Sequence, residues 1–266
     1  QMPHEFFFDE CLKLGVHLPS FGKYGVGVIF FPKEIRLREE CRDIFNRSAE
    51  KLGLEVLAYR KVPVNKDGIG FTALTVEPEM EQVFIACPDH INNPDEFERK
   101  LFVLRNYAAH TIQETVKKDA IGFYIASLSY KVIVYKGQLT SMQVRNYFPD
   151  LSNKRMVSAF GLVHSRFATN TFPSWKLAQP FRYIAHNGEI NTLQGNVNWM
   201  RAREADLSHP GWGSDIALMK PVVDMTGSDS AMLDNALEML NLSGRDLPHA
   251  LLMLAPEAWE KIDLPQ

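Results

Sequence analysis

Apolar positions along the chain fall into short runs that predict a set of strands. The segment Tyr24–Phe31 is rich in β-branched and aromatic residues and is bounded by Gly22 and Pro32, which is typical of a buried strand. Further segments share this apolar character and are also predicted to be strands: Leu54–Val64, Glu81–Cys87, Val132–Tyr135 and Ala159–Val163.

Other stretches place apolar residues three and four positions apart, which is the spacing of one face of a helix. Residues 34–52 form such a stripe, and Gly53 stands where a helix commonly ends. Asn93 is suited to cap a helix that begins at Pro94, and the apolar face of that helix continues to Ile112. Shorter helices are predicted at residues 6–14, 142–148, 197–205 and 230–242.

The order of these elements indicates the fold class. Strands and helices are mixed without a regular strand–helix–strand alternation, which favours an α+β fold or a layered αββα arrangement over a doubly wound sheet. No stretch rich in proline, glycine and serine divides the chain. We therefore expect residues 1–266 to form a single domain.

The composition and net charge of the chain disfavour two classes of partner, nucleic acids and membranes. Of the 266 residues, 45% are hydrophobic and 23% are charged, as in ordinary globular proteins. The net charge of −3 gives no basic excess that would favour nucleic acid or an anionic membrane. The apolar run Val26–Phe31 is far too short to span a bilayer. We expect neither a nucleic-acid partner nor a membrane partner.

The cysteine and histidine patterns bear on metals and redox chemistry. Cys11, Cys41 and Cys87 are widely spaced, and their odd number disfavours a disulfide framework and favours a reducing compartment. The eight histidines show no metal-ligand spacing. We therefore expect no metal site in this chain.

Candidate chemistry begins in the stretch from His164 to Trp175. Arg166 directly follows a predicted apolar strand and precedes a turn-prone run of hydroxyl and amide side chains. An arginine at such a place can bind a carboxylate through two parallel hydrogen bonds. The alternative is an ordinary surface loop with a solvated arginine.

Two further stretches add complementary groups. Asn187-Gly188 is either a hairpin turn or a pair of converging donors, the Asn187 side-chain amide and the Gly188 N–H, as in an oxyanion hole. In Gly227-Ser228-Asp229-Ser230, either Ser228 or Asp229 caps the following helix, or Asp229 presents its carboxylate to an ammonium group. An arginine for a carboxylate and an aspartate for an ammonium are what an α-amino-acid ligand requires.

These stretches resemble the class II, N-terminal-nucleophile glutamine amidotransferase domain at the front of glutamate synthases. The resemblance extends over essentially all 266 residues and is densest in residues 162–175, 185–204 and 227–240. The segments most similar to glutamate synthases in particular are Thr171-Phe172-Pro173-Ser174-Trp175 and Gly195-Asn196-Val197-Asn198-Trp199-Met200-Arg201-Ala202-Arg203-Glu204.

The resemblance implies a role for each candidate residue. Arg166 would bind the α-carboxylate of glutamine with support from Thr169, and Asp229 would hold the α-ammonium group. Asn187 and Gly188 would form the oxyanion hole. The implied fold is a four-layer αββα sandwich of the N-terminal-nucleophile hydrolase type. The implied reaction is attack of a cysteine thiolate on the side-chain amide, loss of ammonia, and hydrolysis of the thioester to glutamate.

In the family that this chain resembles, the nucleophile is a cysteine at the very N-terminus whose own α-amino group acts as the base. It lies in a segment ahead of the part that matches Gln1–Phe8. The present sequence begins at Gln1. We therefore expect a domain that is incomplete at its N-terminal end and inactive by itself. The alternative is a non-catalytic module of the same fold that binds an amino acid.

The resemblance also implies partners elsewhere. Ammonia would pass to 2-oxoglutarate in the rest of the parent enzyme, where FMN and an iron–sulfur cluster are expected, and no cofactor is expected in this chain. The expected partners are glutamine, the remaining glutamate synthase domains, and a small subunit or ferredoxin. The expected compartment is the cytoplasm, or the plastid stroma for a plant source.

Overall fold

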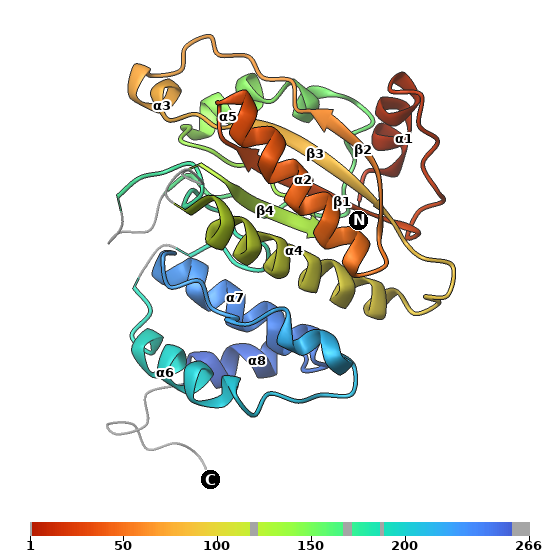
Figure 1. Cartoon of the computed structure of the whole chain (residues 1–266). Coiled ribbons are helices and arrows are strands. Elements are labelled where there is room, and N and C mark those ends of the chain that lie inside the picture. The colour runs from red at the N-terminus through yellow and green to blue at the C-terminus, as the bar shows by residue number, and fades with distance from the viewer. Residues whose placement is uncertain (1, 118–121, 167–171, 187–188, 257–266) are drawn as a thin grey trace.

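A four-stranded antiparallel sheet forms the centre of the first half of the chain (Figure 1). The computed structural model describes residues 2–117, 122–166, 172–186 and 189–256. The strand order is β2-β3-β1-β4, with bounds β1 Tyr24–Phe31, β2 Glu55–Lys61, β3 Glu79–Ala86 and β4 Tyr124–Ser129. All eight residues of β1 are buried, as its unbroken apolar sequence predicts for a central strand that is covered on both faces.

Helices α2 (Ile35–Lys51) and α4 (Pro94–Val116) lie side by side over one face of the sheet (Figure 1). Their apolar stripes pack with Ile29 and Phe31 into the largest hydrophobic core. The predicted helix ends are confirmed: the side chain of Asn93 accepts a hydrogen bond from the N–H of Asp95. Gly53 has a positive φ of 68°, which suits a glycine after a helix.

The opposite face of the sheet is covered by α1 (His4–Lys13) and by the segment that contains α3 (Phe71–Thr75), α5 (Ser141–Tyr147) and the 3-10 helix Pro149–Ser152. Alternate residues of β1 point this way, because successive side chains of a strand face opposite sides. Val28 and Phe30 pack in one core on this face, and Tyr24 and Val26 pack in another.

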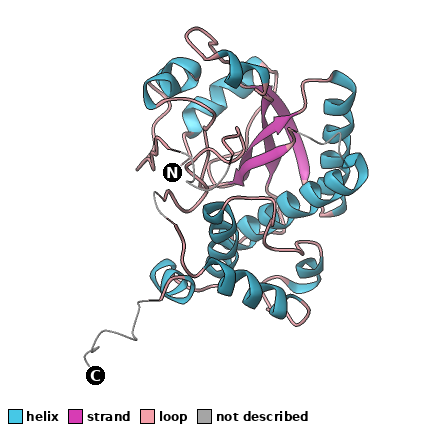
Figure 2. Cartoon of the chain, turned by 90° about the vertical axis from the view of Figure 1, so that its left-hand side faces the viewer, coloured by secondary structure: helices cyan, strands magenta, loops and turns pink. Residues whose placement is uncertain are grey.

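The C-terminal helices extend the layer that α4 begins. They are α6 (Leu193–Glu204), the 3-10 helix Gly213–Ala217, α7 (Asp229–Leu242) and α8 (Leu247–Leu254). Figure 1 shows α6, α7 and α8 grouped below the sheet, with α7 nearest to α4, and Figure 2 shows the helices below the strands from the side. Leu233 and Leu237 of α7 belong to the same hydrophobic core as α4, so the helical part and the sheet share one interior.

The mixed α+β class predicted from the sequence is confirmed, but two predicted strands are wrong. Val132–Tyr135 forms no strand; β4 lies earlier, at Tyr124–Ser129. The segment Val132–Tyr135 is attached to β4 by a hydrogen bond to a side chain instead of a backbone ladder. The N–H of Val134 donates to the hydroxyl of Ser127. Ala159–Val163 is exposed and forms no strand among the described residues.

Other expectations have mixed outcomes. Cys11, Cys41 and Cys87 are free thiols, in line with the prediction of no disulfide framework. None of the described helices is both long and apolar enough to cross a membrane. The expectation that residues 1–266 form one domain, and the expectation of a second sheet in a four-layer sandwich, stay predictions.

Candidate active site

A cavity of about 840 Å³ lies between α4, the first residues of β4, the loop 173–182, α6 and the segment 221–227 that leads into α7. This volume is in the range of small-molecule sites. Its wall is part apolar, with Trp175, Phe181 and Val222, and carries charges of both signs from Arg201 and Glu204. Such a lining suits a small polar molecule with separate positive and negative ends.

Several polar side chains in the described part of the wall have buried atoms without a hydrogen-bond partner. The side chains of Asn106, His110 and Ser174 line the cavity. Among the described residues, Asn106 Nδ2, His110 Nδ1 and Ser174 Oγ are buried without a hydrogen-bond partner. Burial of an unpaired polar atom costs free energy, so polar atoms without partners are uncommon inside folded proteins and gather here in the wall of one cavity.

Specific side chains hold the walls of the cavity. Glu204 Oε1 accepts from the N–H of Val222 at 2.7 Å, and Asn235 Oδ1 accepts from the N–H of Asp224 at 3.1 Å. On the other side, the indole N–H of Trp175 donates to the carbonyl of Ala73 at 3.0 Å. The loops around the cavity are therefore fixed by side-chain contacts rather than by strand pairing.

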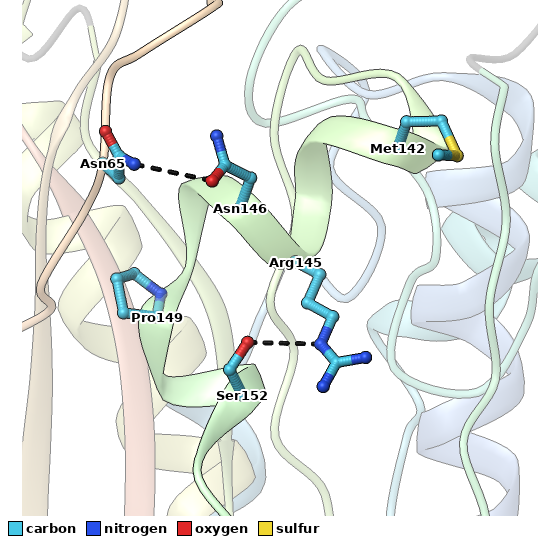
Figure 3. Close-up of a pocket in the computed structure, with 6 residues that line it drawn as sticks. All are labelled: Asn65, Met142, Arg145, Asn146, Pro149 and Ser152. Atoms are coloured by element: carbon cyan, nitrogen blue, oxygen red, sulfur yellow. Dashed lines mark hydrogen bonds between the residues drawn. The ribbon is translucent and has the colours of Figure 1, made fainter.

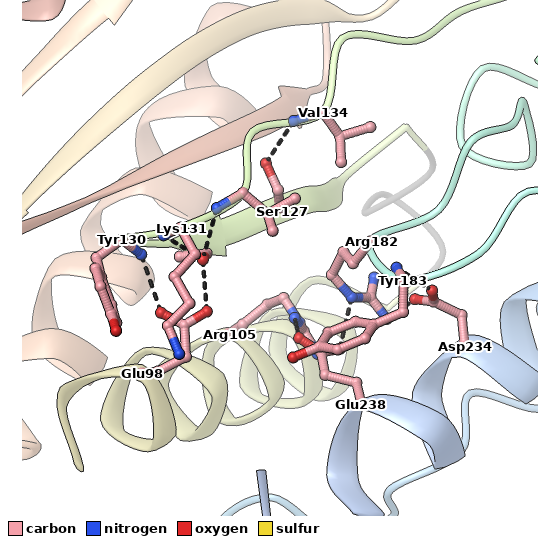
Figure 4. A network of polar contacts seen from close by, with 12 residues as sticks. Glu98, Arg105, Ser127, Tyr130, Lys131, Val134, Arg182, Tyr183, Asp234 and Glu238 are labelled. Atoms are coloured by element: carbon pink, nitrogen blue, oxygen red, sulfur yellow. Dashed lines mark hydrogen bonds and ion pairs between the residues drawn. The ribbon is translucent and has the colours of Figure 1, made fainter. Parts of the chain in front are cut away.

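A buried ionic cluster lies beside the cavity (Figure 4). Arg105 of α4 makes two hydrogen bonds of 2.7 Å to Glu238 of α7. Arg182 donates from Nε to Glu238 at 2.6 Å, and its Nη2 lies 2.8 Å from Asp234 Oδ2. Both arginines also line the cavity. Two cations and two carboxylates thus tie the loop at residue 182 to α4 and α7.

The two carboxylates respond differently to burial. Burial raises the pKa of Asp234, and the nearby Arg182 only partly offsets this. Burial also acts to raise the pKa of Glu238, but the guanidinium groups of Arg105 and Arg182 outweigh it, and the pKa of Glu238 lies below its ordinary value. Glu238 is therefore the fixed negative charge that compensates both arginines.

The predicted ammonium-binding residue, Asp229, is the first residue of α7 and is half-buried. Ser228 caps this helix by accepting from the N–H of Ala231 at 3.2 Å, and Asp229 Oδ1 accepts from the N–H of Ser230 at 2.6 Å. Asp229 itself does not line the cavity, whereas Gly227 does. The start of α7 thus lies at the cavity edge.

The predicted carboxylate-binding residue, Arg166, is exposed and does not line the cavity. Its N–H donates to Nδ1 of His164 at 3.0 Å in a local turn. Thr169, Asn187 and Gly188 lie outside the described residues. The meeting of all five predicted residues in one pocket therefore stays a prediction.

The cysteines do not line the cavity and are poorly suited to nucleophilic attack. Burial raises the pKa of Cys11 to about 12 and that of Cys41 to about 11. Burial also raises the pKa of the half-buried Cys87. A thiol must be deprotonated to act as a nucleophile, so the surroundings of these three disfavour that role.

Two further features of the described chain bear on where chemistry can occur. The described residues contain no group of three or more histidine, cysteine, aspartate or glutamate side chains that could hold a metal ion. A second hollow, between Asn65, Arg145 and Ser152, is open and shallow (Figure 3). The side chains of Arg145 and Ser152 hydrogen-bond to each other there, at 3.2 Å.

The residues of the ionic cluster were not among those predicted from the sequence. The one available signal was the placement of Asp234 and Glu238 four residues apart on a helix face that also carries Leu233 and Leu237. Carboxylates on an otherwise buried face indicate buried cationic partners, but the spacing does not identify them. Arg105 and Arg182 lie 133 and 56 residues away from Glu238 along the chain.

Comparison with known proteins agrees with the resemblance. The family model described as "Glutamine amidotransferases class-II" matches residues 1–264. The chain is 46% identical to "Glutamate synthase [NADH]" of Schizosaccharomyces pombe and 44% identical to "Glutamate synthase [NADPH] large chain" of Bacillus subtilis. It is 41% identical to "Ferredoxin-dependent glutamate synthase 2" of Synechocystis. Each match covers 97% of this chain but only 12%, 17% and 16% of the respective relative.

Proposed function

This chain belongs to the class II glutamine amidotransferases, and from that membership we propose that it is the glutamine-hydrolysing domain of a glutamate synthase. The observation that carries the proposal is the 46% identity to a glutamate synthase over 97% of the chain. The relatives include forms named for NADH, NADPH and ferredoxin, so the amidotransferase part is shared across electron donors.

The proposed reaction releases ammonia from the side-chain amide of glutamine. Arg166, supported by Thr169, binds the α-carboxylate, and Asp229 binds the α-ammonium group. Asn187 and Gly188 donate hydrogen bonds to the oxyanion that forms when the thiolate attacks. Binding both charged ends of glutamine places its amide at a fixed distance from the nucleophile, which removes most of the orientational cost of the reaction.

The proposed nucleophile is the N-terminal cysteine of the family, with its α-amino group as base. Cys11, Cys41 and Cys87 do not replace it, because each is preceded by a peptide bond and has no free α-amine. The finer fold that this mechanism implies is the four-layer αββα sandwich.

The parent enzyme is proposed to pass the ammonia to 2-oxoglutarate and to reduce the product to glutamate. FMN and an iron–sulfur cluster would supply the electrons and would lie in other domains, and the donor would be a small subunit or ferredoxin. The proposed location is the cytoplasm, or the plastid stroma for a plant source.

The proposal is tested by Arg166→Lys in the full-length parent enzyme. Lysine keeps the charge but loses the planar fork, so the KM for glutamine should rise about ten- to a hundredfold, the cost of a charge-assisted hydrogen bond. The matched control is Arg155→Lys, because Arg155 is an exposed arginine that pairs with Asp9 on the surface. It should leave KM unchanged. An unchanged KM in Arg166→Lys would remove the assigned role.

A further inference from the structure

Helix α8 (Leu247–Leu254) is apolar on nearly all sides, although it lies at the surface. Six of its eight residues are apolar, and it contains no acidic residue, lysine or arginine. Only Ala250 and Leu254 of this helix are buried. A helix that is hydrophobic all round is normally covered on every side. The sequence of α8 therefore suits the interior of a larger structure, whereas the described part of the chain covers only one side of it.

The exposed side chains of α8 lie opposite its buried ones. Successive residues of a helix are about 100° apart around its axis, so Leu252 faces directly away from Ala250 and Leu254. Leu252 is 64% exposed, and its neighbours Met253 and Leu251 are 41% and 38% exposed. We call these three adjacent residues, Leu251 to Met253, the α8 face. Water in contact with such a face is unfavourable, so covering it would stabilise the protein.

Both ends of α8 are held by side chains, so the exposure does not come from an unravelled helix. At its start, the Asp246 side chain accepts from the N–H of His249 at 2.7 Å. At its end, the carbonyl of Leu254 accepts from Thr192 Oγ1 at 2.6 Å and from Asn196 Nδ2 at 2.7 Å. These last two bonds join the final turn of α8 to the start of α6, beside which it lies (Figure 1).

Helix α6 adds an exposed aromatic residue. Trp199 is 67% exposed and lies outside the packed side of α6, whose buried residues are Val197 and Met200. The guanidinium group of Arg203 lies over its ring, 5.5 Å from the centroid. Tryptophan and arginine are the residue types that contribute most at protein interfaces. A ring already held by a neighbouring cation loses less freedom when a partner covers it.

We propose that the α8 face, together with Trp199, is the surface on which the rest of a glutamate synthase polypeptide packs. The inference rests on the proposed function. The chain matches only 12% and 17% of the two relatives from Schizosaccharomyces pombe and Bacillus subtilis, so most of a full-length relative lies outside these residues. The match extends to forms named for NADH, NADPH and ferredoxin. This favours the polypeptide that these forms share over a separate electron donor as the occupant.

The test is photo-cross-linking in the full-length parent enzyme with Leu252→benzoylphenylalanine. Illumination should join position 252 to a peptide of the same polypeptide that lies outside these 266 residues. Mass spectrometry identifies the peptide, and a denaturing gel shows whether one chain or two are joined. The matched control is Met142→benzoylphenylalanine, because Met142 of α5 is 86% exposed and lies on the opposite face of the sheet from α4. Its yield should be much lower.

Several outcomes would overturn the proposal. A cross-link to a second copy or to a separate subunit would assign the α8 face to another occupant. The absence of any cross-link from position 252 would show that the face stays open. Equal yields from positions 252 and 142 would show that exposure alone, rather than packing, decides the reaction.

A second measurement uses a charge on the α8 face. Leu252→Glu should fold, because Leu252 is largely exposed within the described part of the chain. Burial of the new carboxylate at an apolar contact costs free energy, so the first thermal transition of the full-length enzyme should move to lower temperature. Met142→Glu should leave that transition unchanged. Equal shifts in the two variants, or no shift in Leu252→Glu, would contradict the proposal.

Neither measurement depends on catalysis. A parent enzyme that does not hydrolyse glutamine would refute the proposed function. The cross-link and the thermal shift would still decide whether the α8 face is covered, so the two failures are distinguishable.

Discussion

The sheet region and the cavity loops of this protein are held in place by different chemistry. In β1, β3 and β4 the backbone ladder sets the position of each strand, and the pairing of Val26 with Phe84 and Ser129 is one rung of it. In the loop that includes Gln179–His186, side chains hold the backbone instead, because Gln179 and Asp234 bond its N–H and carbonyl groups directly.

Both regions contain buried polar side chains. They differ in whether those side chains bond to other side chains or to the backbone. The sheet region also contains a buried cation, Arg60, which bonds Glu10, Gln82 and Asp150. These contacts join one side chain to another, and the backbone at each end is already fixed, by the ladder at Arg60 of β2 and Gln82 of β3 and by helices at Glu10 and Asp150. Around the cavity, loss of a side chain frees the backbone itself. Single polar substitutions should therefore disturb function there more than in the sheet.

The largest expected effect is that of Glu238→Ala, which leaves Arg105 without its carboxylate and Arg182 with only one. Removing one partner of a buried ion pair should lower the free energy of unfolding by about 3–5 kcal/mol. The matched change Glu79→Ala removes a partner of Lys61, which is 70% exposed, and should cost less than about 1 kcal/mol. Urea unfolding of both variants measures the difference. Equal losses would show that burial adds nothing to the contribution of the Glu238 ion pairs.

An intermediate effect is expected from the two helix caps, Asn93 of α4 and Ser228 of α7. Each side chain accepts an N–H of the first helical turn, so Asn93→Ala and Ser228→Ala should each cost about 1 kcal/mol of stability. Only Ser228→Ala should also raise the KM for glutamine in the parent enzyme, because Ser228 precedes Asp229. If both variants changed the KM for glutamine alike, the cap at Ser228 would have no closer connection to glutamine binding than the cap at Asn93.

The smallest effect is the pH dependence from His110 in the cavity wall. Burial lowers the pKa of His110 below its ordinary value of 6.5, although Asp224, Glu114 and Glu204 act in the opposite direction. The unfolded chain therefore binds a proton at a higher pH than the folded chain, and stability is lost as the pH falls below about 6.5. The slope is at most about 1.4 kcal/mol per pH unit for one proton.

The variant His110→Gln should flatten this slope, because glutamine does not titrate. The measurement is the free energy of unfolding in urea at a series of pH values between about 7.5 and 5. Parallel curves for the two proteins would show that His110 does not carry the effect.

Local pattern was enough to predict much of the fold. The apolar run Tyr24–Phe31 and the stripe of residues 34–52 predicted β1 and α2, since hydrophobic period and end residues are properties of neighbouring positions. Asn93 and Gly53 were recognised for the same reason. The resemblance to class II amidotransferases also lay in contiguous motifs, and the family model that matches residues 1–264 agrees with it.

By itself, therefore, the sequence determined the elements with a clear apolar period, such as β1, α2 and α4, together with the α+β class and the family. Only the tertiary structure decided that Tyr124–Ser129 rather than Val132–Tyr135 pairs with β1, and that Arg105, Arg182, Asp234 and Glu238 meet beside the cavity. The physical reason is the separation along the sequence of the residues that interact. The apolar face of a helix or strand is formed by residues a few positions apart. Strand partners and buried ion pairs join distant positions that only the folded chain brings together.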